Sequence, residues 1–185
     1  ENIMAGSLFF VDKFTVSSDV SSVTIGGGSS GSSSYNFTID STYNVYKLII
    51  YGLRADTNSS SPQIRVTKSG TAQSDSEYDE AAKQLKAYNT FGNNDDVNLT
   101  SWGFNTTGTN ANSSFNLIAY LFNFADASEY SFATFEEATS DTTLDFRGKQ
   151  GGGVHTVASA SDGINISVSS GNIASGELVL YGLKN

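Results

Sequence analysis

The chain has 185 residues, enough for one domain that buries about 70% of the surface its unfolded chain would expose. Its net charge is -9, and its ten Lys and Arg residues are scattered, which excludes the basic surface of a duplex-binding protein. The absence of cysteine excludes disulfides and thiolate-bound metal. No apolar run approaches the length of about 20 residues that spans a bilayer. We therefore expect neither nucleic acid binding nor membrane insertion.

The composition predicts β-structure. Charged residues make up only 16% of the chain, so Ser, Thr, Asn and Gly supply most of its polarity. These residues favour turns and exposed strand positions over helix interiors, because their side chains compete for backbone hydrogen bonds. Twelve Phe, nine Tyr and one Trp supply large apolar side chains for a core. The sequence therefore predicts an all-β protein with many loops.

The N-terminal half begins with residues 1–20, which we expect to form an N-terminal arm or an edge strand. The Gly/Ser-rich run over 26–34 predicts a flexible loop. Residues 46–51 are apolar on both faces, which predicts a central strand that is covered on both sides or packed at an interface. Residues 76–88 suit a short helix or a strand, and their β-rich surroundings favour the strand. Further strands are predicted over 8–16, 22–26, 35–39 and 62–68.

The C-terminal half opens with two polar stretches, 89–98 and 106–114, which predict exposed loops. Residues 117–122 are apolar on both faces, as 46–51 are. Ile164–Val168 alternates between apolar and polar residues, which predicts a strand with one wet face. The remaining strands are predicted over 129–138, 142–147 and 154–159. This spacing of short strands predicts a jelly-roll-like antiparallel β-sandwich, with residues 1–185 forming a single domain.

One sequence pattern occurs twice. Residues 48–53 read LIIYGL, and residues 178–183 read LVLYGL. Only two copies occur and no fixed period links them, so the pattern does not indicate a solenoid. We expect the two segments to be neighbouring strands of one sheet in which the two ends of the chain meet.

The only histidine, His155, is the first candidate for catalysis. The Gly-x-Ser-x-Gly spacing occurs only at residues 27–31, inside the Gly/Ser-rich run and not at a strand-to-helix nucleophile turn, so we interpret His155 as an exposed or partly buried structural residue. Paired carboxylates could serve glycoside hydrolysis, and Glu136–Glu137 is one adjacent pair. Neighbouring residues of a strand point to opposite faces, so these two cannot converge on one bond. Separate carboxylates could still meet across the fold. The other clusters are Asp95–Asp96 and Glu77 with Asp79 and Glu80. We predict no catalytic residue and no enzyme.

Metal and phosphate sites are weakly supported. The oxygen-rich run Asn93–Asp96 could supply ligands to calcium, but it lacks the Asp-x-Asp-x-Asp-Gly spacing of a known calcium loop, so a solvated turn is the alternative. The glycines at 26–28 and 151–153 lack the residues that follow a phosphate-binding loop, and we interpret them as turn or close-packing glycines. We expect no other cofactor.

Trp102 and Phe104 are the remaining candidate contact residues. They lie among Thr, Ser, Gly and Asn in a stretch that predicts a polar loop. Exposed aromatic rings of this kind stack on sugar rings or contact a neighbouring subunit. The same two side chains could instead pin the loop to the core.

Residues 171–183 read GNIASGELVLYGL. This stretch resembles the closing segment of small virion structural proteins of tailed bacteriophages, including marine ones. Residues 39–48, together with Leu53–Arg54, resemble the first core strand of that family, which is entered through an Asp-Ser-x-Tyr turn. The run 151–154 and the aromatic strand around 120–122 extend the likeness over most of residues 20 to 183. Two stretches depart from the family pattern, namely 75–86 and 124–137.

The resemblance implies a non-enzymatic protein on the virion surface, as a capsid decoration protein or a head or tail fibre component. It also implies a homo-oligomer that docks to other virion proteins. We expect a trimer because aromatic residues are in surplus, among them Phe122, Phe124, Tyr130, Phe132 and Phe135. The alternative function is a carbohydrate-binding or adhesion module that binds host surface glycans through Trp102.

Overall fold

The computed structural model describes residues 7–27, 37–88, 90–140 and 142–184, and within these ranges it contains strands and no helix. In the described ranges, therefore, no helix is present that could cross a membrane. The strands are β1 (Ser7–Val16), β2 (Ser22–Ile25), β3 (Val45–Ala55), β4 (Pro62–Lys68), β5 (Thr71–Ala72), β6 (Tyr78–Lys86), β7 (Gly92–Leu99), β8 (Trp102–Gly103), β9 (Phe115–Phe122), β10 (Ser131–Ser140), β11 (Phe146–His155), β12 (Gly163–Val168) and β13 (Ile173–Lys184).

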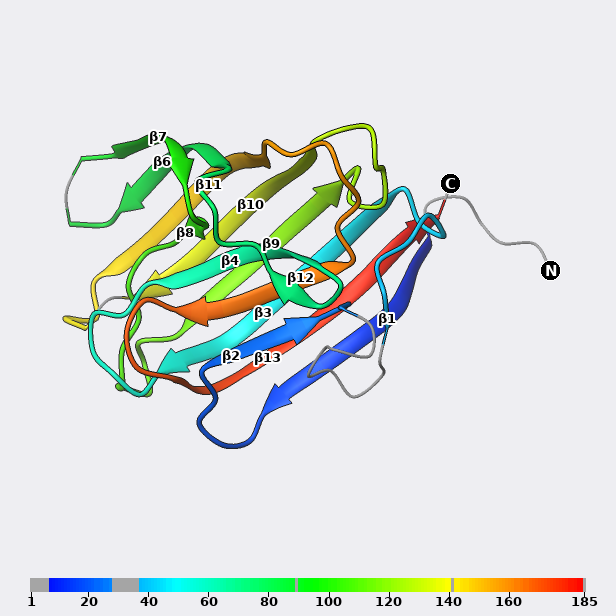
Figure 1. Cartoon of the computed structure of the whole chain (residues 1–185). Coiled ribbons are helices and arrows are strands. Elements are labelled where there is room, and N and C mark those ends of the chain that lie inside the picture. The colour runs from blue at the N-terminus through cyan, green and yellow to red at the C-terminus, as the bar shows by residue number, and fades with distance from the viewer. Residues whose placement is uncertain (1–6, 28–36, 89, 141, 185) are drawn as a thin grey trace.

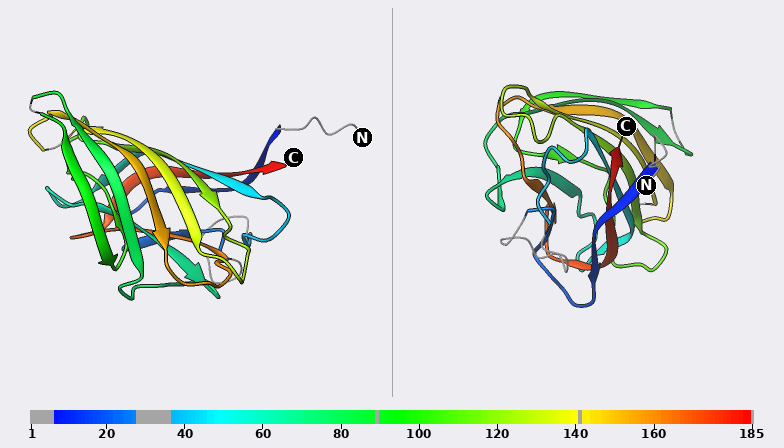
Figure 2. Two further views of the ribbon diagram at one scale, coloured as in Figure 1. Left: turned by 90° about the horizontal axis from the view of Figure 1, so that it is seen from above. Right: turned by 90° about the vertical axis from the view of Figure 1, so that its right-hand side faces the viewer.

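These strands form two antiparallel sheets packed as a β-sandwich, which confirms the predicted fold class. The large sheet has eight strands in the order β1-β13-β3-β9-β10-β11-β6-β7. The small sheet has the order β2-β12-β4-β5, and the short strand β8 also pairs with β4. The small sheet lies in front of the large one in Figure 1, and the large sheet curls around it in Figure 2. The jelly-roll form of the sandwich stays a prediction.

The repeated segments are neighbours in the large sheet, as the sequence predicts. Strand β13 pairs with β3, and Leu180 lies opposite Leu48 while Leu178 lies opposite Ile50. Strand β1 pairs with the other side of β13, where Ser7 lies opposite Lys184. The two ends of the chain therefore meet in one sheet, and β1 is its edge strand, as expected for part of residues 1–20.

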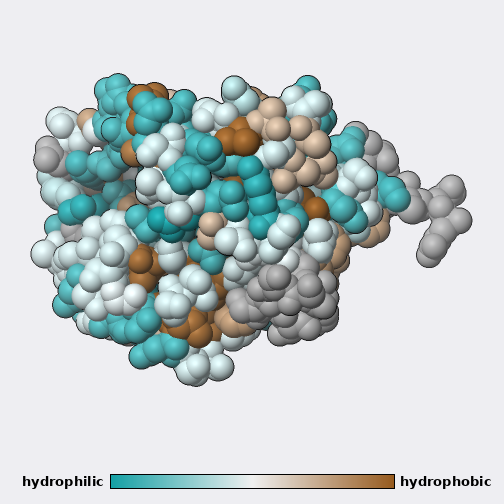
Figure 3. Space-filling model, in the orientation of Figure 1, coloured by the Kyte–Doolittle hydropathy of each residue, from teal (hydrophilic) through white to brown (hydrophobic). Residues whose placement is uncertain are grey.

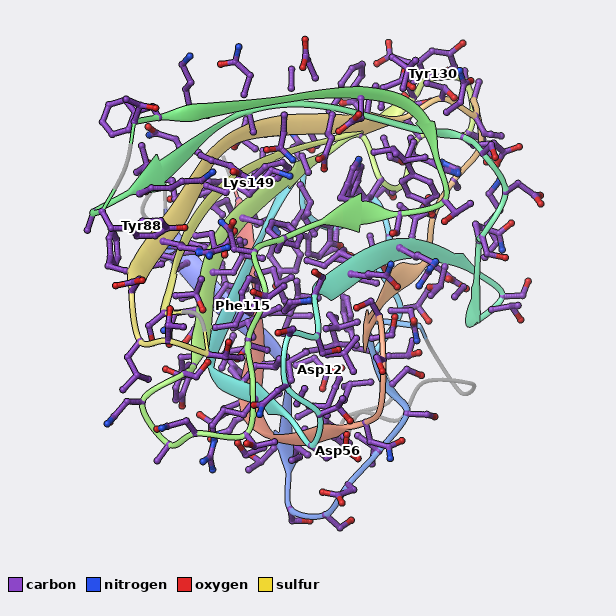
Figure 4. All side chains as sticks on the ribbon, turned by 90° about the vertical axis from the view of Figure 1, so that its left-hand side faces the viewer. Asp12, Asp56, Tyr88, Phe115, Tyr130 and Lys149 are labelled. Carbon is purple, nitrogen blue, oxygen red and sulfur yellow. The ribbon has the colours of Figure 1, made fainter. Side chains whose placement is uncertain are left out.

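The core fills the space between the two sheets. Alternate residues of each strand point inward, and the large fully buried side chains Leu48, Phe115 and Leu121 come from β3 and β9. Ile164 and Ile166 of β12 face them from the small sheet and are fully buried. Figure 4 shows Phe115 inside the sandwich, whereas Tyr88 and Tyr130 lie at its periphery.

Several predicted boundaries are wrong. Strand β7 covers most of 89–98, where an exposed loop was predicted, because it pairs with β6 from Tyr78 to Gln84. Residues 142–145 and 156–159 lie outside the strands, since β11 runs from 146 to 155 through a glycine-rich stretch. That stretch carries no apolar alternation that would predict a strand.

Three other predictions have mixed outcomes. Residues 76–88 contain strand β6 and no helix, which confirms the strand interpretation. Of the predicted strand 35–39, only a single bridge between Thr38 and Gly27 forms in the described part. Most of the predicted 26–34 loop lies outside the described residues. In the predicted loop 106–114, residues 109–112 are exposed, but Thr107 and Ser113 are buried.

Candidate functional site

Trp102 and Phe104 lie inside the protein. Strand β8 carries Trp102 next to β4, where it is only 1% exposed, and Phe104 directly after it is 7% exposed. The Trp102 ring makes an edge contact with Tyr78, and Phe104 makes edge contacts with Phe115 and Phe135. Neither side chain can stack on a sugar or contact a subunit from this position. The exposed interpretation of both residues is therefore wrong, and both pin their segment to the core.

The burial of Trp102 depends on a glycine of β11. A Cβ atom at Gly153 would lie 2.4 Å from the Trp102 Nε1 atom, well inside van der Waals contact. The missing side chain therefore makes room for the indole ring. The interpretation of 151–153 as close-packing glycines is confirmed at this position, although the run lies within a strand rather than in a turn.

Beneath the β8 segment lies a cluster of charged and polar side chains, which we call the buried charge cluster: Glu80, Asn105, Glu137 and Lys149. Lys149 is 1% exposed, and its Nζ donates hydrogen bonds to Glu80 Oε1 and to the Gly103 carbonyl oxygen, each over 2.6 Å. The Gly103 amide donates to Glu80 Oε2 over 3.2 Å. Lys149 also lies 5.5 Å from the ring centres of Phe104 and Phe135, a cation–π distance. Figure 4 shows Lys149 inside the sandwich.

Glu137 belongs to the same cluster but has a different partner. Its carboxylate accepts hydrogen bonds from the backbone amide of Asn105 over 3.2 Å and from the Asn105 Nδ2 over 3.1 Å. Burial raises the pKa of Glu137 to about 7, although the Asn105 hydrogen bonds and the charge of Lys149 oppose the shift. Its sequence neighbour Glu136 points to solvent and accepts a hydrogen bond from Gln150. The prediction that this adjacent pair cannot converge is confirmed.

The chemistry open to the buried charge cluster is limited by access. Glu80 and Glu137 come from β6 and β10, and both interact with Lys149 of the strand between them. Carboxylates that are separate in the sequence thus meet across the fold, as the sequence analysis left open. A substrate would have to displace the β8 segment to reach them, because each side chain is buried. The direct interactions of the cluster hold that segment between the sheets.

The single histidine is more deeply buried than predicted. His155 ends β11 and is fully buried because its side chain points inward onto the ring of Tyr78, 4.8 Å away between ring centres. Its Nε2 lies 3.4 Å from Glu77 Oε2. Burial, with a smaller contribution from Lys68, lowers the pKa of His155. His155 packs as a neutral aromatic side chain at neutral pH.

The run Asn93–Asp96 is not arranged around one ion. It lies in β7, so Asn93 and Asp95 project to one face while Asn94 and Asp96 project to the other. The Asn93 side chain accepts a hydrogen bond from Lys83, 2.5 Å away. In the ranges that the structure describes, no group of three or more His, Asp or Glu side chains is placed to hold a metal.

The outer face of the large sheet, which is the face turned away from the small sheet, carries the most unusual surface. One cross-strand row on it is apolar over six neighbouring strands, and we call it the apolar row. Strand register places its members opposite one another from β1 to β11. Leu8 and Phe132 are 49% and 42% exposed, and the other four are partly buried. The row consists of Leu8, Leu183, Val45, Phe122, Phe132 and Val154.

Further apolar side chains lie beside the apolar row. Phe10 and Tyr181 form the next row on β1 and β13, with their rings in edge contact. Tyr120 follows on β9 and lies under the ammonium group of Lys47. Ile118 and Tyr51 are also exposed on this face. The prediction that 46–51 and 117–122 are apolar on both faces is confirmed, and their outer side is open in the single chain.

The outer face of the small sheet has the opposite character. Its register places Ser22 beside Ser167 and Thr24 beside Asn165, and the latter two side chains are hydrogen-bonded over 3.0 Å. Arg65 of β4 donates to Ser167. This side faces the viewer in Figure 3 and is mostly hydrophilic, with only isolated apolar patches.

No protein-family model matches the sequence, and no curated protein matches it significantly.

Proposed function

We propose that this protein is a non-enzymatic structural component of a bacteriophage virion, displayed on the particle surface as a capsid decoration or fibre protein. It acts by docking through the outer face of its large sheet. The single observation that supports docking is the apolar row, which leaves side chains such as Leu8 and Phe132 exposed in the single chain. Exposed apolar patches of this kind mark protein interaction sites in soluble proteins.

The virion assignment is supported by the sequence resemblance. The stretches that resemble virion proteins include residues 39–48 and 171–183, which supply much of the neighbouring strands β3 and β13 of the large sheet. These two stretches also supply Val45 and Tyr181 to the outer face. The family-like strands therefore contribute to the proposed docking surface.

The alternative of a carbohydrate-binding module loses the site on which it was based. Trp102 is buried between the sheets, so its substitution would test folding rather than glycan binding. The buried charge cluster supports a structural role in the same way, since its hydrogen bonds end on the β8 segment and on Asn105.

Mass spectrometry of purified virus particles from the natural source tests the proposal. We expect this chain among the particle proteins, and imaging of the particles is expected to locate it on the capsid surface or on a fibre. Many copies over the shell would establish decoration, and a few at the tail would establish a fibre role. Its absence from the particles would overturn the virion assignment.

A further inference from the structure

We infer that the partner of the outer face is a second copy of this chain, and that two large sheets pack face to face about a two-fold axis. This inference rests on the proposed function, because it names the occupant of the docking surface. It replaces the expected trimer, since two of the aromatics that suggested a trimer, Phe124 and Phe135, are buried in the core.

The apolar part of the outer face approaches the size of a dimer interface. The apolar row crosses six strands, and their five spacings of about 4.8 Å span roughly 24 Å. The exposed apolar residues extend about 20 Å along the strands, from the level of Val45 to that of Tyr51. The flat footprint is therefore roughly 500 Å², and protruding side chains add to it. A standard interface buries about 800 Å² on each partner.

The charge of the face favours a partner with the same surface. Strand alternation places four cations on it, and it places four carboxylates there as well, so the face is neutral on a chain whose net charge is -9. Two copies can therefore approach through this face without the repulsion that their other surfaces create. One pair is already formed within the face, between Lys13 and Glu177 over 2.7 Å. The cations are Lys13, Lys47, Arg54 and Lys83, and the carboxylates are Asp79, Asp95, Glu136 and Glu177.

The relief of the face is self-complementary. Ile118, Glu136 and Gln150 form a ridge across three neighbouring strands, and a groove lies on each side of it. One groove, of about 490 Å³, includes Ala138 and the other, of about 430 Å³, includes Thr134. Inner faces of stacked sheets interdigitate in this way, and a two-fold axis lets each copy place its ridge in a groove of the other.

Both edges of the large sheet disfavour association by strand addition. On β1 the register shifts between Phe10 and Asp12, and Asp12 points inward with its side chain fully buried. On β7 the pairing shifts near Asp96, and Asn98 has a positive φ of 56°. Bulges and inward-pointing charges are devices that prevent edge pairing. Association through the large sheet is therefore left to its outer face.

Cysteine cross-linking tests the two-fold arrangement, because the chain has no cysteine of its own. Single variants Ile49→Cys, Ile118→Cys and Tyr120→Cys place a thiol at the centre of the face, and a short bismaleimide is added at low micromolar protein. We expect covalent dimers from all three variants. The control Thr71→Cys, at an exposed residue of the small sheet, is expected to stay monomeric. Dimers from the control alone, or equal yields at every position, would overturn the inference.

Sedimentation equilibrium provides the second test. Phe132→Glu places a charge in the apolar row, and we expect it to weaken dimerisation at least about tenfold relative to the natural chain. Thr71→Glu, on the small sheet, is the control and should leave the dimer unchanged. A natural chain that is monomeric at 100 μM, or trimeric, would overturn the inference. A monomer that is nevertheless found on particles would leave the proposed function standing, with the outer face bound to another virion protein. A dimer that is absent from particles would overturn only the virion assignment.

Discussion

Strand β10 shows the difference between the two sides of the large sheet. Its inner side carries Glu137, buried in the sandwich, and its outer side carries Phe132, which is largely open to solvent. A domain that only had to fold would place these residues the other way round, since buried charges cost free energy and exposed apolar surface gains none. Each inversion therefore needs a reason, and the two reasons differ.

The inner charges are explained within the chain itself. Lys149 and Glu80 satisfy each other and both backbone groups of Gly103, while Glu137 satisfies Asn105. The outer apolar side chains find no such explanation among the described residues of one chain. This contrast shows a buried charge cluster whose interactions lie within the fold, and it supports the proposal that the outer face docks to a partner.

The largest expected effect is on the inner side. Lys149→Met would leave the buried Glu80 carboxylate without its cation and the Gly103 carbonyl without its donor. We expect a loss of about 3–5 kcal/mol in the free energy of unfolding, measured by urea titration. The double variant Glu80→Gln/Lys149→Met should recover part of this loss. Full stability of the single variant would show that the cluster does not hold the β8 segment.

A second effect is expected from the raised pKa of Glu137. The folded state keeps this proton up to about pH 7, whereas the unfolded chain releases it near pH 4.5. The stability that protonation contributes is thus complete below about pH 4.5 and is lost as the pH rises through 7. Glu137→Gln should therefore gain up to about 3 kcal/mol relative to the natural chain between pH 4 and pH 8. If the difference in free energy of unfolding between the two proteins stayed constant from pH 4 to pH 8, the raised pKa of Glu137 would be contradicted.

A smaller effect should follow from filling the space occupied by the Trp102 ring. Gly153→Ala forces a methyl group against the indole and against the Asp79 carbonyl oxygen, 3.0 Å away. We expect a cost of about 1–3 kcal/mol in thermal or chemical unfolding, with a change in Trp fluorescence. Gly103→Ala is the control, because its added Cβ would meet no atom within 4 Å.

The smallest effect on stability is expected on the outer face. Phe132→Ala removes an exposed ring whose strand neighbours are Phe122 and Val154, so we expect a cost below about 1 kcal/mol for the unassociated chain. Phe135→Ala, three positions along the same strand but in the core, should cost about 3–5 kcal/mol. Dilute samples monitored by circular dichroism measure both. Equal costs would show that Phe132 packs within the chain.

Much of the fold could be predicted from the sequence. The apolar segments around Leu48 and Leu121 predicted the central strands, and the LxxYGL pair predicted the contact of β3 with β13. The predicted strands 142–147 and 154–159 touched only the two ends of β11, because Gly148 and Gly151–Gly153 in its middle carry no side chains whose periodicity could reveal it. Strand β7 was missed because Asn and Asp are rare in strands, and only its edge position tolerates them.

The site was harder to predict, because its residues are far apart in the sequence and no local pattern brings them together. Trp102 lies in a polar stretch, so its burial depends on a gap at Gly153, fifty-one positions along the chain. The contact between Lys149 and Glu80 requires strand pairing across 69 positions, which no local pattern shows. The outer face was predicted better. Alternation within 46–51 and 117–122 already placed apolar residues on both sides of the sheet.

Hydroxyl-radical footprinting tests the central claim, that the outer face is the docking surface, because it reads the exposure of each side chain in solution. The natural chain would be labelled at 1 μM and at 100 μM, and oxidation would be mapped by mass spectrometry. We expect oxidation of Leu8, Tyr120 and Phe132 to fall at the higher concentration, while oxidation of Arg65 on the small sheet stays constant. Unchanged oxidation of the outer face, or protection of Arg65 alone, would contradict the account.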